Sequence, residues 1–354
     1  MARVTDGLLY NKADRAMNRT RTKMMENQEQ AVTGRRINKP SDNPQGMVRA
    51  IGLKTKIDRN EQSMKNMEIA NSYLGVTDSS LAELSNVLSR AKELAVQMSN
   101  SSNQSPDAMR AVQSEADELF YQALQIGNTR VGEHYIFAGY QTERPPFDEN
   151  GNYYGDLGQI QIEVQPGQKV PLNVTGLKPF MGLDEIPKRI AVEGEEEGDE
   201  SQAAVPAKLQ PVLSRDPASL IAESRQIDPK ENPEAFAQIQ QSVGVNIFQS
   251  LKTFSQGLKE GRPELIHQTL DNIDKAFSQV LETRATVGAL QNAVVTNTDL
   301  VDAQQVTNQL LKSNVVDADT TQVYSDLARN EALLNSTLQA NKKLLTPSLL
   351  DFLK

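Results

Sequence analysis

Apolar side chains recur at alternating spacings of three and four residues along both halves of this 354-residue sequence. The longest run covers residues 67–98, and a second follows Ser105 and Pro106, which fit the N-cap and first position of a helix. A third run covers residues 266–294. This spacing is typical of helices that pack along one apolar stripe, so long helices must bury their stripes against one another.

The middle of the chain lacks this helical spacing. Residues 160–164 and 170–174 alternate apolar and polar side chains, with Pro166 and Gly167 between them, which predicts a β-hairpin. The acidic run EGEEEGDE at residues 193–200 predicts a solvent-exposed loop, because so many carboxylates cannot be buried together. Its spacing differs from that of an EF-hand loop, so it does not indicate a metal site.

These patterns predict a mainly α protein: an elongated antiparallel helical bundle built from the N- and C-terminal segments, with a central β-rich outer domain and terminal coiled-coil-like helices. We expect the helical bundle at residues 41–138 with 236–315. The acidic outer domain is expected at residues 139–235. The terminal helices, residues 1–40 with 316–354, are expected to form the inner shaft of a polymer.

Both ends of the chain carry residues spaced eleven apart, a period of about 3.67 residues per turn that keeps an apolar stripe nearly straight. Two isolated helices bury little surface, so we expect both ends to be disordered in the monomer and to become ordered when copies pack into a helical tube. The residues expected at this assembly interface are Leu9, Ala13, Met24, Ala31, Val323, Leu327, Leu334, Leu338, Leu345 and Leu349.

The stretch TGRRINKPSDNPQG, at residues 33–46, separates the N-terminal helix from the bundle. A glycine free to adopt a positive φ can end the first helix, and Arg35, Arg36 and Lys39 lie where positive charge favours a helix C-terminus. An asparagine followed by a proline can cap and start the next helix. We therefore expect a hinge at four residues: Gly34, Pro40, Asn43 and Pro44.

The sequence lacks the motifs of known catalytic and cofactor sites. It has no cysteine and only two histidines, His134 and His267, without zinc-ligand spacing. No nucleophile elbow, Walker A loop or dinucleotide fingerprint occurs. We therefore expect no catalytic, metal-binding or cofactor-binding residues, no cofactor and no enzymatic activity.

Charge and hydropathy exclude two further classes of partner. Residues 1–40 hold nine Lys/Arg and four Asp/Glu, but no aromatic platform accompanies them, so we expect no nucleic-acid binding. No apolar run approaches the roughly 20 residues that span a bilayer, so we expect no membrane insertion. The N-terminus lacks the apolar region of a cleaved signal peptide.

Several motifs resemble those of the flagellin superfamily. They are TGRRINKPSDNPQGMVRA near the N-terminus, RATVGALQNAV at residues 284–294, and VVDADTTQVYSDLARNEALLNSTLQAN near the C-terminus. The stretch GEHYIFAGYQTERPPF, at residues 132–147, is similar to the entry into the outer domain of the hook-associated members of that superfamily.

The resemblance implies a non-enzymatic structural component of the bacterial flagellum, an adaptor at the hook–filament junction. It implies export of the unfolded chain through the flagellar type III apparatus to an extracellular location. The implied partners are other copies of the chain in a helical ring, hook-associated protein 1, flagellin, and a cytoplasmic export chaperone on the C-terminal segment. Two alternatives stay open: a filament flagellin with a small outer domain, and a surface adhesin that uses residues 139–235.

Overall fold

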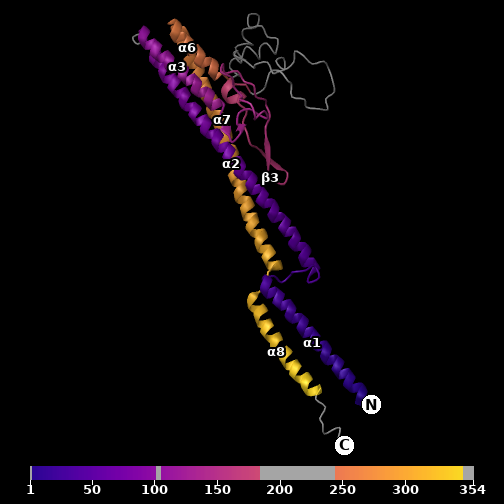
Figure 1. Ribbon diagram of the computed structural model, residues 1–354. Coiled ribbons are helices and arrows are strands. Elements are labelled where there is room, and N and C mark those ends of the chain that lie inside the picture. The colour runs from indigo at the N-terminus through magenta and orange to yellow at the C-terminus, as the bar shows by residue number, and fades with distance from the viewer. Residues whose placement is uncertain (1, 101–104, 184–243, 346–354) are drawn as a thin grey trace, which may run out of the picture. The chain divides into compact units, whose positions relative to one another are not determined.

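The computed structural model describes residues 2–100, 105–183 and 244–345, without the side chains of residues 2–10, 13 and 340–345. The chain divides into two compact units. The first unit is Met1–Gln62 with Val301–Lys354, and the second is Ser63–Leu300. Two long helices, α2 (Pro44–Ser99) and α7 (Pro263–Val316), contribute residues to both units (Figure 1).

In the second unit, α2 carries a buried stripe that confirms the spacing at residues 67–98. Each position is at most 1% exposed: Met67, Ala70, Leu74, Thr77, Leu81, Leu84, Leu88, Ala91, Ala95 and Met98. Ion pairs of 2.5 Å between Lys92 and Asp274 and of 3.0 Å between Arg284 and Asp78 link α2 to α7. Residue numbers rise along one helix as they fall along the other, so the two helices run antiparallel.

The stripe on α7 differs in part from the predicted one. Its fully buried residues recur every seven positions: Ile266, Ile273, Val280, Val287 and Val294. Thr269, Ala276 and Thr283 complete the stripe, whereas Leu270 and Phe277, within the run predicted at residues 266–294, are only half-buried. Each threonine hydroxyl donates to the carbonyl four residues earlier, at 2.7 and 2.9 Å. That bond offsets the cost of burying the hydroxyl, so a polar residue type serves as core.

Two shorter helices, α3 (Pro106–Gly127) and α6 (Ile247–Glu260), pack against each other in the second unit. Ser105 caps α3, since its Oγ accepts a 3.3 Å bond from the Ala108 N–H. Gly261 ends α6 in the left-handed region with a φ of 64°. The predicted start of α3 is therefore confirmed, and a glycine with a positive φ ends α6.

Strands are few and short in the described part of the chain. The antiparallel pairs are β1 (Arg130–Val131) with β2 (His134–Tyr135), and β3 (Gln161–Gln165) with β4 (Gln168–Pro171). The β3–β4 pair confirms the predicted hairpin, and Gly167 adopts a φ of 81° in its turn. The predicted acidic loop at residues 193–200 lies outside the described residues.

An aromatic cluster holds the segment after α3 onto the helices. It contains five of the nine phenylalanines: Phe120 of α3, Phe137, Phe147, Phe180 of the π-helical turn η2 (Leu177–Met181), and Phe248 of α6. Neighbouring ring centroids in the cluster lie 4.9–5.7 Å apart. Aromatic pairs at this separation contribute beyond the area they bury, so residues 137–180 are fixed to α3 and α6.

The mainly helical fold with small two-stranded sheets agrees with the predicted fold class. The described part of the predicted outer domain, residues 139–183, belongs to the second unit together with the helices. The division of the chain at residues 40, 138 and 235 into shaft, bundle and outer domain stays a prediction.

Replacing Leu119 by alanine tests the packing of α3. Leu119 is 5% exposed, so Leu119→Ala should lower the free energy of unfolding by about 2–5 kcal/mol, which chemical denaturation measures. Leu281→Ala is the matched control, because Leu281 is 43% exposed and its loss should change stability by less than about 0.5 kcal/mol. Equal midpoints for the two variants would contradict the packing of α3.

Candidate assembly interface

The first unit contains two terminal helices, α1 (Ala2–Thr33) and α8 (Thr320–Leu345), which pack side by side (Figure 1). The covered side chains of α1 recur at spacings of three and four: Met17, Thr20, Met24, Asn27 and Ala31. Those of α8 follow the same rule: Val323, Leu327, Asn330, Leu334 and Thr337. Among these ten, only Val323 is fully buried, so the pair covers its own stripe incompletely.

Half of the predicted interface residues lie on these two stripes: Met24, Ala31, Val323, Leu327 and Leu334. Leu338 is exposed and lies beside the α8 stripe. The remaining predicted residues, Leu9, Ala13, Leu345 and Leu349, have side chains outside the described part of the chain. The role of all ten residues in assembly stays a prediction.

Both terminal helices also expose large apolar side chains away from the shared stripe. Val32 of α1 is 83% exposed, and Tyr324, Leu333 and Leu338 of α8 are exposed as well. At about 100° per residue, Tyr324 and Leu338 lie on one flank of the α8 stripe and Leu333 lies on the other. Because α8 is apolar on three sides and α1 covers one, this surface suits a helix with several neighbours.

The two breaks between helices lie against each other within the first unit. Residues 34–43 connect α1 to α2, and residues 317–319 connect α7 to α8. The Ala318 N–H donates to the Gly34 carbonyl at 3.0 Å, and the Arg36 N–H donates to the Val316 carbonyl at 2.7 Å. Gly34 has a φ of 66°, the left-handed conformation expected at the end of α1. These bonds hold the two breaks together as one joint.

The side chain of Arg36 strengthens this joint. Its Nη2 donates to the backbone carbonyls of Val315 at 3.0 Å and Asn314 at 3.4 Å, in the last turn of α7. Free carbonyls at a helix C-terminus attract positive charge. The sequence places Arg36 at the end of α1, but its guanidinium caps the end of α7, a contact between segments that are distant in the sequence.

The start of α2 is built as its sequence predicts. Pro44 is its first residue, and Asn43 Oδ1 accepts a 2.9 Å bond from the Gly46 N–H. Ile37 is buried beside Gly46, where a Cβ would lie 2.5 Å from Ile37 Cδ1. Pro40 is exposed. The sequence signals a break here, but the buried contact of Ile37 requires the folded joint.

Asp42 stabilises the turn inside the joint. Its Oδ2 accepts bonds from the N–H groups of Lys39 at 2.9 Å and Asn38 at 3.0 Å, and these bonds lower the pKa of Asp42. The folded-state pKa then lies below the ordinary value of about 3.9. The contribution of this carboxylate is therefore present at neutral pH and is lost as the pH falls through the lowered pKa.

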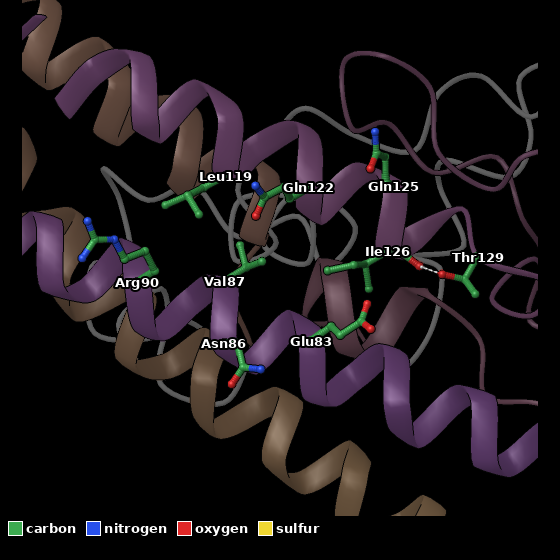
Figure 2. A pocket seen from close by; sticks show the side chains of 9 residues that line it. All are labelled: Glu83, Asn86, Val87, Arg90, Leu119, Gln122, Gln125, Ile126 and Thr129. Atoms are coloured by element: carbon green, nitrogen blue, oxygen red, sulfur yellow. Dashed lines mark hydrogen bonds between the residues drawn. The ribbon is translucent and has the colours of Figure 1, made fainter. Parts of the chain in front are cut away.

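The second unit carries a surface pocket of about 600 Å³ between α2 and α3 (Figure 2). Its apolar lining is Val87, Leu119 and Ile126, and its polar lining is Glu83, Asn86, Arg90, Gln122, Gln125 and Thr129. Glu115 and Glu93 pair with Arg90 at 2.7 and 3.0 Å, so the charge of its guanidinium is already balanced. The Thr129 hydroxyl is bound to the Ile126 carbonyl, as Figure 2 shows.

Neither a metal site nor a membrane span occurs in the part of the chain that the structure describes. No group of three His, Cys, Asp or Glu side chains within it could hold a metal ion. None of its helices is long and apolar enough to cross a bilayer. The exposed apolar side chains of the terminal helices make these helices and their joint a candidate site for protein association.

Replacing Arg36 by alanine tests the joint. Arg36→Ala removes the bonds to Val315 and Asn314, and we expect a loss of roughly 1 kcal/mol for these partly solvated contacts. Hydrogen exchange of the Ala318 amide should accelerate about fivefold. Arg35→Ala is the matched control, because the hydrogen bonds found for Arg35 in the described part of the chain use its backbone, so removing its side chain should leave this rate unchanged. Equal exchange rates in the two variants would show that the Arg36 side chain does not stabilise the joint.

The sequence is similar to those of known flagellar proteins. A chain named flagellar hook-associated protein 3 of Escherichia coli (strain K12) is 29% identical over 180 residues, 50% of this chain and 56% of that relative. The protein of the same name from Salmonella typhimurium is 23% identical over 342 residues, 95% of this chain and 94% of its own. This chain thus spans about half of one relative and nearly all of the other.

Solved structures show the same fold. A flagellar hook-associated protein from Vibrio parahaemolyticus superposes with a TM-score of 0.57 at 12% identity, covering 78% of this chain and 100% of its own. FlgL from Bacillus cereus gives a TM-score of 0.50 at 17% identity, covering 74% and 99%.

Two family models match the ends of the chain. The model of the bacterial flagellin N-terminal helical region matches residues 5–142, and the model of the bacterial flagellin C-terminal helical region matches residues 270–353. Together they cover more than half of the sequence, and they include all but the first three residues of α1, together with α8 and the joint. The chain belongs to the flagellin family.

Proposed function

We propose that this chain is a non-enzymatic structural subunit of the bacterial flagellum, which assembles at the hook–filament junction through its terminal helices. The apolar surface of α8 carries this proposal. Its stripe toward α1 is only partly covered, and Tyr324, Leu333 and Leu338 remain exposed on both flanks. Further copies of the same helix pair would bury these faces.

The location at the junction rests on the relatives named flagellar hook-associated protein 3, one of which aligns with 95% of this chain. In this proposal, copies form a helical ring that contacts hook-associated protein 1 on one side and flagellin on the other. The chain is exported unfolded through the type III apparatus, with a cytoplasmic chaperone on its C-terminal segment, and acts outside the cell. The absence of cysteine suits such export, because no disulfide must form afterwards.

The domain arrangement belongs to the same proposal. Residues 1–40 with 316–354 form the inner shaft and become ordered only when copies assemble, and residues 41–138 with 236–315 form the bundle. Residues 139–235 form the outer domain. Gly34, Pro40, Asn43 and Pro44 serve as the hinge between shaft and bundle, which the paired helix breaks support.

A filament flagellin is the second candidate, because flagellins also occur among the relatives. The flagellin of Clostridium tyrobutyricum is 29% identical over 126 residues, 36% of this chain and 33% of that relative. Immunogold labelling separates the two roles. A junction subunit should be labelled in one narrow zone at the base of the filament, whereas a filament subunit should be labelled along its whole length.

Replacing Leu334 by aspartate tests assembly through the terminal helices. Leu334→Asp places a charge on the α8 stripe and should reduce the amount of the chain in purified flagella at least tenfold. The melting temperature of the purified monomer should stay unchanged, because the bundle does not use this residue. Asn335→Asp adds the same charge at an exposed neighbour and should assemble normally. A lower melting temperature for Leu334→Asp alone would argue against a role confined to assembly.

A further inference from the structure

One face of α2 repeats every seven residues from position 53 to position 95. Six of its seven positions carry apolar side chains that are each at most 8% exposed: Leu53, Met67, Leu74, Leu81, Leu88 and Ala95. The exception is Asn60, which is half-buried and whose Nδ2 is closed to solvent without a hydrogen-bond partner. A polar residue in such a stripe costs stability, because its buried atom loses its bonds to water.

Gln305 of α7 lies at the same level as Asn60 within the first unit. Its Nε2 donates to Oε1 of Glu61, the next residue of α2, at 3.4 Å. Gln305 is 7% exposed, and its Oε1 is also buried without a partner. Of the three such atoms among the described residues, two therefore lie at this one level. They match in type, because Asn60 supplies a donor and Gln305 an acceptor.

The apolar residues of the two helices do not by themselves fix how far α2 lies along α7. The buried stripe of α7 also repeats every seven residues, from Ile266 to Val301. A slip of seven residues, about 10 Å along the helix, would again place apolar positions opposite apolar positions. The two ion pairs between α2 and α7 would be lost, but their side chains are 32–51% exposed, and such pairs contribute little.

The polar level responds differently to such a slip. In either direction, Gln305 would come to lie opposite a buried apolar residue of α2, Leu53 or Met67. Its carboxamide would also move about 10 Å away from Asn60. Placing a buried carboxamide against apolar side chains is costly, so this level distinguishes the observed alignment from its neighbours.

We infer that Asn60 and Gln305 determine the register of α2 on α7. Selecting one alignment among several apolar ones is the best-attested role of a buried polar residue in paired helices. The alignment matters at the joint, because the Arg36 guanidinium reaches the carbonyls of Asn314 and Val315 when the end of α7 lies level with it. The inference concerns the folding of a single copy and does not depend on the proposed function.

Disulfide trapping in the purified full chain tests the register, and the absence of native cysteine gives a clean background. Met67→Cys with Thr298→Cys reports the observed register, because Thr298 Oγ1 donates to Met67 Sδ at 3.4 Å. Met67→Cys with Gln291→Cys reports the slip of seven residues that brings Gln305 opposite Leu53. In glutathione buffer, we expect the first pair to form at least tenfold more disulfide than the second, slipped pair.

Asn60→Leu with Gln305→Leu removes the polar level. Because the apolar stripes then fit in more than one alignment, we expect disulfide of the slipped pair to rise at least fivefold. Glu61→Ala is the matched control, since the exposed Glu61 is solvated in either register and its removal should leave the ratio of the two disulfides unchanged. No rise in the slipped disulfide after removal of the polar level would overturn the inference.

Moving the asparagine supplies an independent test that keeps Gln305. Leu53→Asn with Asn60→Leu shifts the carboxamide of α2 by seven residues, so that Gln305 faces it only after the slip. We expect at least fivefold more slipped disulfide. Ile57→Asn with Asn60→Leu is the matched control, because Ile57 is equally buried but no slip of seven residues brings it opposite Gln305. Equal slipped disulfide in the two variants would show that lost stability alone releases the helices, and the inference would be wrong.

Discussion

The structure depends on one constraint: long amphipathic helices must bury an apolar stripe, and the terminal helices α1 and α8 meet that need less completely than the helices of the second unit. There, α2 and α7 bury stripes in which nearly every position is closed to solvent, and α3 and α6 add a second packed pair. In the first unit, the paired stripes of α1 and α8 are mostly half-covered, and Val32 is almost fully exposed. Apolar side chains of α1 and α8 therefore stay exposed, and both helices lie in the regions that match the flagellin family models.

The joint combines this unfinished packing with a well-bonded connection. Backbone bonds pair the two helix breaks, and Arg36 caps α7 from the segment that follows α1. The ends of a helix leave backbone N–H and C=O groups without partners inside the helix. Two helix breaks that lie side by side would therefore leave many such groups to bond with water alone. Here each break supplies partners for the other.

The two parts of α7 differ in which side chains they leave exposed. Up to Val294 its β-branched residues face the chain's own core, with Thr269 and Thr283 bonded to the preceding turn. From residue 301 onward, Gln305 is buried together with Val301 and Val316, while Val306 and Leu310 are exposed. A single helix thus buries apolar side chains along its whole length and also leaves large apolar side chains exposed near its end.

The sequence by itself determined the helical class, the stripe of α2, the cap of α3, the hairpin turn at Gly167 and the start of α2 at Pro44. These features depend on local spacing and on residues with restricted backbone conformations, which act over a few residues. Tertiary structure alone decided the roles of Thr269 and Thr283, the clustering of five phenylalanines, the reach of Arg36 to α7 and the outward face of Val306 and Leu310. Each of these features depends on which distant segment of the chain packs against the residue. The residue type alone does not decide whether a side chain is buried, caps another helix or stays exposed.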